Sequence, residues 1–232
     1  MPRIAIGTLS AGLTIALLSC FLAGTPQAEA LDLRCNDSNV MVHAPDPADA
    51  KSVCDGAVDA IRFLRARGFR TNQIFDVRVV DALPSPIDPA AYGGYVQNER
   101  RAYLLVYSKI AARGTVFGLP FDRALYRSLA THEVAHAIAA LNFRAANPPI
   151  EAVEYIAYAT MFAALPGKHR NAVLERFKSD EFANELHINR SVYLLDPFRF
   201  GVLAYKHFMK LRDGTHFLEL ILTGRALQDF TY

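Results

Sequence analysis

The chain has 232 residues, with 25 Lys and Arg, 23 Asp and Glu, and a formal net charge of +2 at neutral pH. So small a charge implies no strong electrostatic partner, and no basic run interleaved with aromatic residues indicates nucleic-acid binding. Hydrophobic residues make up 52% of the chain, as is typical of a packed globular protein.

The first thirty residues have the composition of a secretory signal sequence. Arg3 precedes a long apolar run over residues 4–24, and Ala28-Glu29-Ala30 offers a small-residue cleavage site. We therefore expect residues 1–30 to be removed. The mature chain, residues 31–232, is then long enough for a single domain, which would be secreted or periplasmic without stable membrane insertion.

Two other interpretations of this leader stay open. The apolar run is almost long enough to span a bilayer as an anchor, although Gly7, Gly12 and the small residues at its end favour cleavage. Cys20 is a candidate for lipidation because it follows Leu17-Leu18-Ser19. Apolar sequence continues beyond Cys20, however, which disfavours that interpretation.

Cys35 and Cys54 are the two cysteines of the expected mature chain. In an exported protein an isolated pair is more often a disulfide than a metal site. A disulfide would tie the mature N-terminus to the first predicted helix. Two zinc-binding thiolates are the alternative, but the close CxxC spacing is absent.

The first half of the mature chain combines helical and strand patterns. Apolar residues recur at helical spacing from Val53 to Leu64, and Gly68 ends the pattern. Residues 74–80 then alternate with period two and predict a strand. Residues 92–97 and 101–108 predict two antiparallel strands joined by a polar turn.

The second half is mainly helical. Strands followed by helices, without βαβ alternation, predict an α+β fold in which a small antiparallel sheet precedes a mainly helical half. The predicted helices are Pro120–Phe143, Pro149–Leu165, Lys168–Glu185, Pro197–Leu211 and a short one near His216–Leu222.

The helix predicted over Pro120–Phe143 carries the segment His-Glu-Val-Ala-His. His132 and His136 are four residues apart, so both project from one helix face and can bind one metal ion. Zn²⁺ accepts neutral imidazole nitrogens, and three protein ligands leave one position for water. Glu133 can then take a proton from that water as a general base. The competing interpretation is a helix whose buried polar residues are satisfied by hydrogen bonds alone.

The next predicted helix offers two carboxylates for the third ligand position. Glu151 has another explanation, because an acidic residue in the first turn complements the helix dipole. Glu154 lies one turn deeper among apolar neighbours, where a carboxylate is costly unless it is paired or metal-bound. The pattern therefore favours Glu154 over Glu151. No third His follows at metzincin spacing.

These segments together resemble the gluzincin metallopeptidases. In that family a downstream helix supplies the third zinc ligand from a Glu-Gly-x-Ala type motif, and here Glu154-Tyr155-Ile156-Ala157 follows the HExxH segment, with Tyr155 in place of Gly. The resemblance covers about residues 103–158. It implies His132, His136 and Glu154 as zinc ligands and Glu133 as base. It also places residues 101–108 as the edge strand that would pair with an extended peptide.

The donor that would stabilise an oxyanion is not fixed by the sequence. Its candidates are Tyr193, Tyr205 and His187. The remaining histidines are predicted to be ordinary surface or partly buried residues. These are His43, His169, His207 and His216.

The functional expectation is an exported zinc metallohydrolase, most simply a peptidase acting on a peptide or protein substrate. In one alternative the protein binds zinc but hydrolyses another amide or an ester instead of a peptide, or binds zinc without catalysing a reaction. A second alternative is a disulfide-stapled envelope or interaction protein without enzymatic activity. The aminopeptidase GxMEN-type signature is absent, so trimming of substrate N-termini is not implied.

Overall fold

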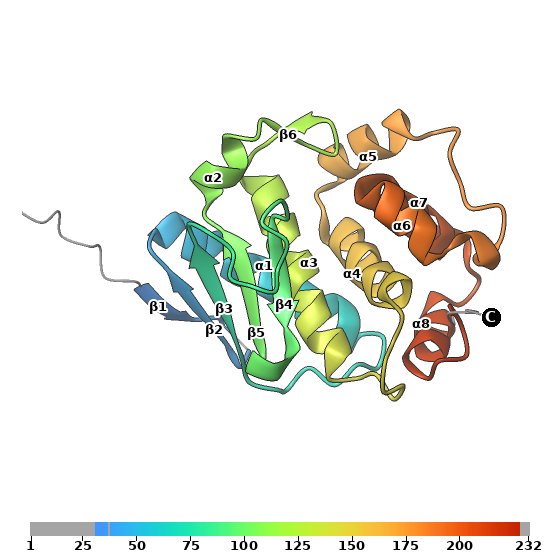
Figure 1. The fold of residues 1–232 in the computed structure, drawn as a ribbon, viewed down its shortest axis with the longest axis horizontal. Helices are drawn as coiled ribbons and strands as arrows, with labels where there is room; N and C mark the ends of the chain where they lie inside the picture. Colours follow the sequence, from blue (N-terminus) through green and yellow to red (C-terminus); the bar gives the residue numbers. More distant parts are fainter. Residues whose placement is uncertain (1–30, 37, 228–232) are drawn as a thin grey trace, which may run out of the picture.

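The structure is a computed structural model that describes residues 31–36 and 38–227. In this part of the chain a small sheet lies at one side and helices fill the other side (Figure 1), so the predicted α+β class is confirmed. The predicted signal sequence, residues 1–30, lies outside the described residues. So does the lipidation candidate Cys20.

The main sheet is mixed rather than antiparallel. Its strand order is β1-β2-β3-β5-β4, and the β2–β3 and β3–β5 pairs are parallel while β1–β2 and β4–β5 are antiparallel. The antiparallel sheet that the sequence suggested is therefore wrong in this detail. The strands are β1 (Leu31–Arg34), β2 (Val40–Ala44), β3 (Phe75–Val80), β4 (Gly93–Val96) and β5 (Arg101–Leu105), and a separate hairpin pairs β6 (Thr115–Val116) with β7 (Leu119–Pro120).

The parallel pairs follow from two connections. A helix between β2 and β3 returns the chain to the starting end of the sheet, as parallel pairing requires. The β4–β5 hairpin then folds back so that β5 lies between β3 and β4. The sequence patterns predicted β3 and this hairpin, although β5 ends at Leu105 and residues 107–108 of the predicted strand belong to a short helix. They missed β2 and also β1, a short, largely exposed edge strand with little apolar alternation.

The helices occupy most of the second half of the chain. Those predicted near residues 53–64, 120–143, 149–165, 197–211 and 216–222 are confirmed, whereas two short helices were not predicted. The helices are α1 (Pro47–Arg65), α2 (Tyr107–Ala111), α3 (Arg123–Ala140), α4 (Ile150–Ala164), α5 (Gly167–Arg176), α6 (Arg190–Leu195), α7 (Pro197–Lys210) and α8 (Gly214–Leu222), with single 3-10 turns at Gln97–Glu99 and Glu185–His187.

Helix α5 ends earlier than the predicted helix 168–185. The chain after Phe177 is irregular up to the turn at Glu185. Lys206 of α7 donates hydrogen bonds to the carbonyl oxygens of Phe177, Lys178 and Asp180. These carbonyl groups therefore bind an ammonium group instead of continuing a helical ladder.

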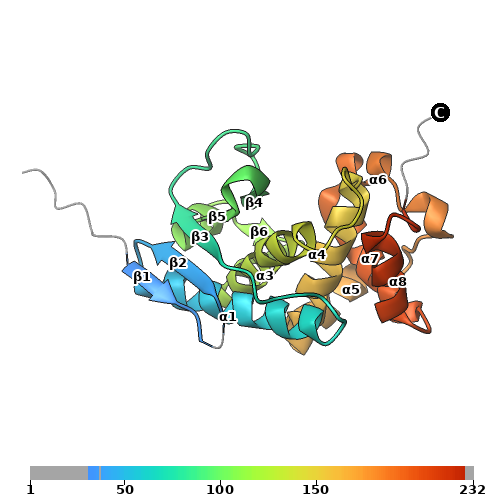
Figure 2. The same cartoon turned by 90° about the horizontal axis from the view of Figure 1, so that it is seen from below.

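Successive layers pack outward from one face of the sheet. Val42, Val77 and Ala102 lie side by side on β2, β3 and β5 and are fully buried. Helices α1 and α3 pack against the sheet and against each other, α4 packs on α3, and α7 packs on α4 (Figures 1 and 2). Helix α3 is thus enclosed between the sheet and the helical half, and almost all of its residues beyond Leu125 are buried.

The predicted disulfide is confirmed. Cys35 follows β1 and bonds to Cys54 in α1, which fixes the start of the sheet to the helix that covers it. Asp46 caps α1 by accepting hydrogen bonds from the backbone N–H groups of Ala48 and Asp49. In the described part of the chain, no helix combines the length and the apolar character that crossing a membrane requires.

Candidate metal centre

Helix α3 brings His132 and His136 together. Asp122 caps the helix by accepting a hydrogen bond from the Leu125 N–H, and the four-residue spacing then places both imidazoles on one face. Their Nε2 atoms are 2.9 Å apart, and both side chains are buried. Two ring nitrogens that face each other at this distance need either a shared proton or a cation between them.

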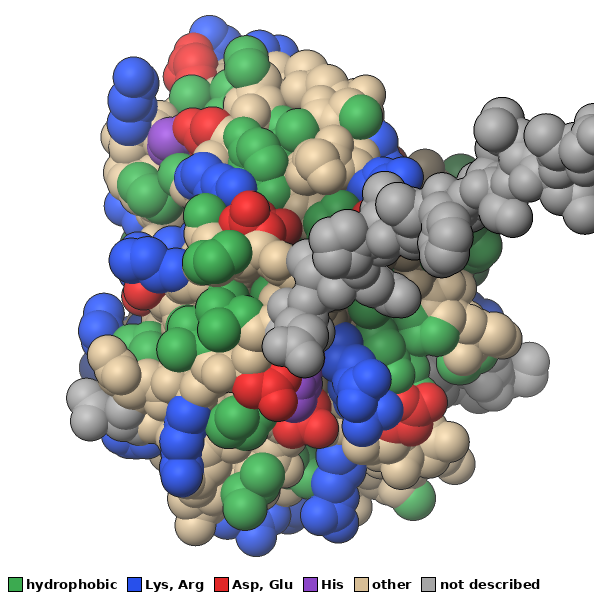
Figure 3. Space-filling view, turned by 90° about the vertical axis from the view of Figure 1, so that its left-hand side faces the viewer, with side chains coloured by type: hydrophobic (Ala, Val, Ile, Leu, Met, Phe, Trp, Pro, Cys, Tyr) green, Lys and Arg blue, Asp and Glu red, His purple; other side chains and the backbone are tan. Residues whose placement is uncertain are grey.

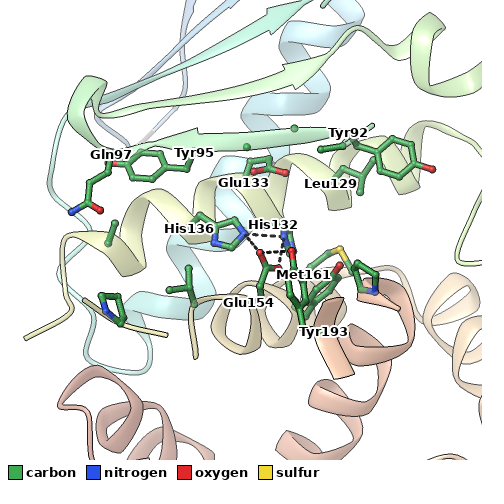
Figure 4. A pocket seen from close by; sticks show the side chains of 18 of the residues that line it. Tyr92, Tyr95, Gln97, Leu129, His132, Glu133, His136, Glu154, Met161 and Tyr193 are labelled. Carbon is green, nitrogen blue, oxygen red and sulfur yellow. Dashed lines mark hydrogen bonds and ion pairs between the residues drawn. The ribbon is translucent and has the colours of Figure 1, made fainter. Parts of the chain in front are cut away.

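Helix α4 adds Glu154 to this pair. One carboxylate oxygen lies 3.4 Å from Nε2 of His132 and the other lies 3.5 Å from Nε2 of His136 (Figure 4). The three residues form a buried group, with ligand atoms within 4.8 Å of one another, that could hold a metal ion. Glu151, the other carboxylate considered from the sequence, is buried in the first turn of α4 and does not belong to this group.

In the absence of metal, the pKa values of His132, His136 and Glu154 depend on one another. Burial by itself would lower the pKa of His132, but the contact with Glu154 and the nearby carboxylate charges outweigh burial and raise it. Burial lowers the pKa of His136 to about 4. Burial would raise the pKa of Glu154, but the charges of both histidines lower it. A deprotonated carboxylate and a neutral imidazole are the forms of these side chains that bind a metal ion.

Glu133 lies beside this group and faces the sheet. In Figure 4 its side chain points toward β4, and its Oε2 atom is buried with no hydrogen-bond partner among the described residues. Gly93 of β4 makes room for it, because a Cβ atom there would come within 2.8 Å of Glu133 Oε1. Burial raises the pKa of Glu133 to about 7. A carboxyl group with such a pKa can exchange protons near neutral pH.

Of the three candidates for the oxyanion donor, the structure brings only Tyr193 to this group. Its hydroxyl donates a hydrogen bond of 3.1 Å to Glu154 Oε1, and it comes from α6. Tyr205 is buried against Phe162, and His187 is exposed beside Asn184. Neither of them lines the cavity described next.

A cavity of about 920 Å³ opens in front of the group. One wall is the edge of the sheet, formed by Gly93, Gly94 and Tyr95 of β4, and the opposite wall includes Glu154 and Tyr193. The edge strand at this cavity is therefore β4. The assignment of residues 101–108 to that role was wrong, because β5 pairs with β3 on one side and with β4 on the other.

Sequence reasoning missed Tyr158, which also lines the cavity. Its ring packs edge-on against His132 with 4.5 Å between ring centroids. Gly201 of α7 lies so close that a Cβ atom there would come within 2.3 Å of the Tyr158 ring. A signal was present, because Tyr158 follows Glu154 by four residues and therefore shares its helix face.

The four remaining histidines have ordinary partners. His43 pairs with Asp32, His169 with Asp122, and His207 with the Tyr155 hydroxyl, and His216 is exposed. The interpretation of these residues as surface or partly buried histidines is confirmed. In the described chain, they join no metal-type cluster.

The fold and this site define an α+β protein with a buried His-His-Glu group that could hold a metal ion inside a cavity. The chain belongs to the family described as "Family of unknown function (DUF6639)", whose model matches residues 40–231. No curated protein and no solved structure matches it.

Proposed function

We propose that this protein is an exported zinc metallopeptidase of the gluzincin type. The observation that carries the proposal is the meeting, in one cavity, of the group His132, His136 and Glu154, the carboxyl group of Glu133 and the open edge of β4. The apolar leader at residues 1–30 and the Cys35–Cys54 disulfide support export to an oxidising compartment.

The donor atoms fit zinc. Two ligands on one tetrahedral zinc ion lie about 3.3 Å apart when zinc–ligand distances are about 2.0–2.1 Å. The two imidazole Nε2 atoms are 2.9 Å apart, and each lies 3.4 or 3.5 Å from one of the two Glu154 carboxylate oxygens, so the separations lie close to that value. Two imidazoles and one carboxylate form the ligand set of many hydrolytic zinc sites. Bound there, zinc would lower the pKa of a water molecule and polarise a carbonyl group.

The residues around the group supply the remaining chemistry. Glu133 takes the proton of the attacking water and passes it to the leaving amine, for which a pKa of about 7 is suitable. Tyr193 already donates to Glu154 and lies at the cavity wall, so its hydroxyl can turn toward the developing oxyanion. Tyr158 orients the His132 ring by packing against it.

The edge of β4 supports a peptide substrate rather than another amide or ester. Gly93, Gly94 and Tyr95 line the cavity at the end of the sheet order, where one side of the strand has no partner strand in the described chain. An extended peptide can form main-chain hydrogen bonds with such an edge. Because Glu133 faces β4 (Figure 4), the scissile carbonyl of such a peptide would lie beside it.

Metal binding is tested by zinc content. We expect about one equivalent of zinc in the purified chain, and its loss in His132→Ala, His136→Ala and Glu154→Ala variants, measured by elemental analysis. His43→Ala is the matched control, since it removes a half-buried histidine that pairs with Asp32 on the far edge of the sheet. Zinc retained after both His132 and His136 are replaced would overturn the site.

Peptidase activity is tested with a peptide library and the Glu133→Gln variant. We expect zinc-dependent cleavage by the original chain and a decrease of about 10²- to 10⁴-fold in kcat/KM when the base is replaced, with zinc retained. Cleavage that Glu133→Gln leaves unchanged contradicts the assigned base. If the chain binds zinc stoichiometrically but cleaves no peptide, the proposed peptidase activity is rejected and only the zinc site is retained.

A further inference from the structure

A second cavity, of about 650 Å³, lies beyond the C-terminal end of α3. It is formed by the turn after α1, the residues after α3, and one side of α8. Three arginines line it, Arg67, Arg70 and Arg144. No residue of the His-His-Glu group belongs to it, so it is a separate feature of the surface.

The positive charge of this cavity is not neutralised within the described chain. Arg67 donates to the carbonyl oxygen of Phe63 and Arg70 donates to that of Leu141, which are neutral acceptors. The Arg144 guanidinium has no hydrogen bond or ion pair with any described residue. Glu219 is the one carboxylate among the described lining residues, and it lies 4.0 Å from His216.

This arrangement differs from the side of the molecule that carries β1. There Figure 3 shows acidic and basic side chains interspersed across the surface, so neighbouring charges offset one another. The second cavity instead gathers three cations against one acid. A concave site with charge of one sign raises the local concentration of ligands of the opposite sign.

Arg144 connects this cavity with the candidate active site. It lines both cavities, and its backbone N–H donates to the Leu222 carbonyl oxygen at 2.9 Å, which ties the loop between α3 and α4 to the end of α8. Because α3 runs from His132 through His136 toward Ala140, the loop beyond it lies at the His136 end of the first cavity. Gln97 and Tyr95 lie at the same end in Figure 4.

We infer that the second cavity is an exosite for an acidic stretch of the polypeptide substrate, which enters it across Arg144 from the His136 end of the cleft. This inference rests on the proposed peptidase function. Carboxylate side chains would pair with the guanidinium groups of Arg70 and Arg144, while Arg67, whose guanidinium stacks over the Phe63 ring, adds positive charge to the cavity. The site would thereby favour substrates with Asp or Glu on one side of the scissile bond.

The test measures binding separately from cleavage. Three blocked peptides of equal length share an apolar centre, and carry Glu residues before it, Glu residues after it, or Gln at all these positions. They are titrated calorimetrically into the zinc-loaded Glu133→Gln chain at low salt. We expect one Glu peptide to bind about tenfold more tightly than the Gln peptide, since exposed ion pairs contribute a few-fold each and salt screens them.

The arginines are then replaced. We expect the advantage of the Glu peptide to fall to about twofold in an Arg70→Gln/Arg144→Gln variant, and to persist in Arg78→Gln, which alters an exposed arginine of β3 outside both cavities. Equal binding of all the peptides, no binding of any, or a preference that survives the double variant overturns the exosite. Displacement by an equal concentration of inorganic phosphate would also overturn it, by showing an unselective anion site.

Failure of the exosite and failure of the peptidase give different results. Cleavage that needs zinc and Glu133 but ignores the charge of the peptide and the Arg70/Arg144 replacements rejects the exosite alone. Arginine-dependent binding of the Glu peptide, without cleavage by the original chain, rejects the peptidase and retains an acid-binding cavity.

Discussion

The candidate active site has an α3 wall, which carries His132, Glu133 and His136, and an α6 wall, which carries Tyr193, and the two are held in different ways. On the α3 wall, Thr131 donates to the Gly56 carbonyl oxygen of α1, and a Cβ atom on Gly56 would come within 2.5 Å of the Arg127 carbonyl oxygen. Buried Asp59 binds Arg127, so helices α1 and α3 are joined by close backbone packing and by an ion pair.

On the opposite wall, α6 is short and contributes no buried residue. Leu194 and Leu195 are 60% and 85% exposed. The preceding chain contacts α7 through the Arg199–Asp180 pair, the hydrogen bonds of Lys206 and the ring contact of Phe182 with Phe200. Elements with few buried contacts open locally at low free energy. The ligands and base on α3 are therefore fixed firmly, whereas Tyr193 on α6 can move.

Removing the disulfide should produce the largest change in stability. The disulfide holds α1 against the sheet, and α1 supports the α3 wall. Cys35 and Cys54 are 19 residues apart, and closing a loop of this length stabilises a fold by about 3 kcal/mol in the chain-entropy description. We expect Cys35→Ser/Cys54→Ser to lower the free energy of unfolding by about that amount, measured by urea denaturation of metal-free protein.

The matched change on the α6 wall should have little effect. Leu195→Ser alters an exposed side chain, so we expect a change within about 0.5 kcal/mol in the same measurement. A loss of stability at Leu195 as large as that of the double cysteine variant would mean that the two walls are held equally firmly.

The pH dependence of stability sharpens the comparison on the α3 wall. The folded-state pKa of Glu133 is raised to about 7 from its usual 4.5, so the folded chain holds this proton more tightly than the unfolded chain. Its contribution to stability is fully present below about pH 4.5 and is lost as the pH rises toward 7. The neutral amide of the Glu133→Gln variant does not ionise, so this loss of stability with rising pH is absent from it.

We therefore expect the metal-free Glu133→Gln variant to gain stability over the original chain with rising pH. Between about pH 5 and pH 6.5 the gain should reach on the order of 2 kcal/mol, because each pKa unit corresponds to about 1.36 kcal/mol. The lowered pKa of His136 has the opposite effect, because it makes stability fall as the pH decreases below about 6.5. This effect is present in both chains, so it cancels when the two are compared. Parallel pH curves from denaturant titrations would contradict the burial of Glu133.

The α3 wall was predictable from sequence because its chemistry is local. The positions of His132, Glu133 and His136 follow from helical periodicity, and Glu154 was favoured because a carboxylate in an apolar helix needs a partner. Tyr193 remained one of three candidates. Its approach to Glu154 depends on a short helix that no apolar periodicity marks.

Sheet topology was harder to predict for a related reason. The period-two pattern of β3 identifies a strand but does not reveal which strands lie beside it. Pairing of β3 with β2 and β5 is decided by the path of the chain through α1 and through the β4–β5 hairpin. Gly93 and Gly94 lie within the predicted strand 92–97, but the strand pattern does not reveal that Glu133 and Ile87 approach them.

A further small effect is predicted for Tyr193 on the α6 wall. Tyr193→Phe keeps the ring that packs edge-on against Phe200 and removes only the hydroxyl that donates to Glu154. We expect stability to decrease by no more than about 1 kcal/mol, the usual contribution of one hydrogen bond. The zinc affinity should decrease about tenfold, since groups that orient a metal ligand typically contribute 10- to 100-fold.

Zinc competition with a chromogenic chelator measures this affinity, and Tyr205→Phe serves as the control because its ring lies outside the cavity. A Tyr193→Phe variant that binds zinc as tightly as Tyr205→Phe would show that α6 does not hold Glu154 in place. If peptide cleavage still fell in that variant, the hydroxyl would act on the substrate rather than on the ligand. Tyr193 would then belong to the mobile wall as an oxyanion donor, and the firmly held α3–α4 group would bind zinc without its help.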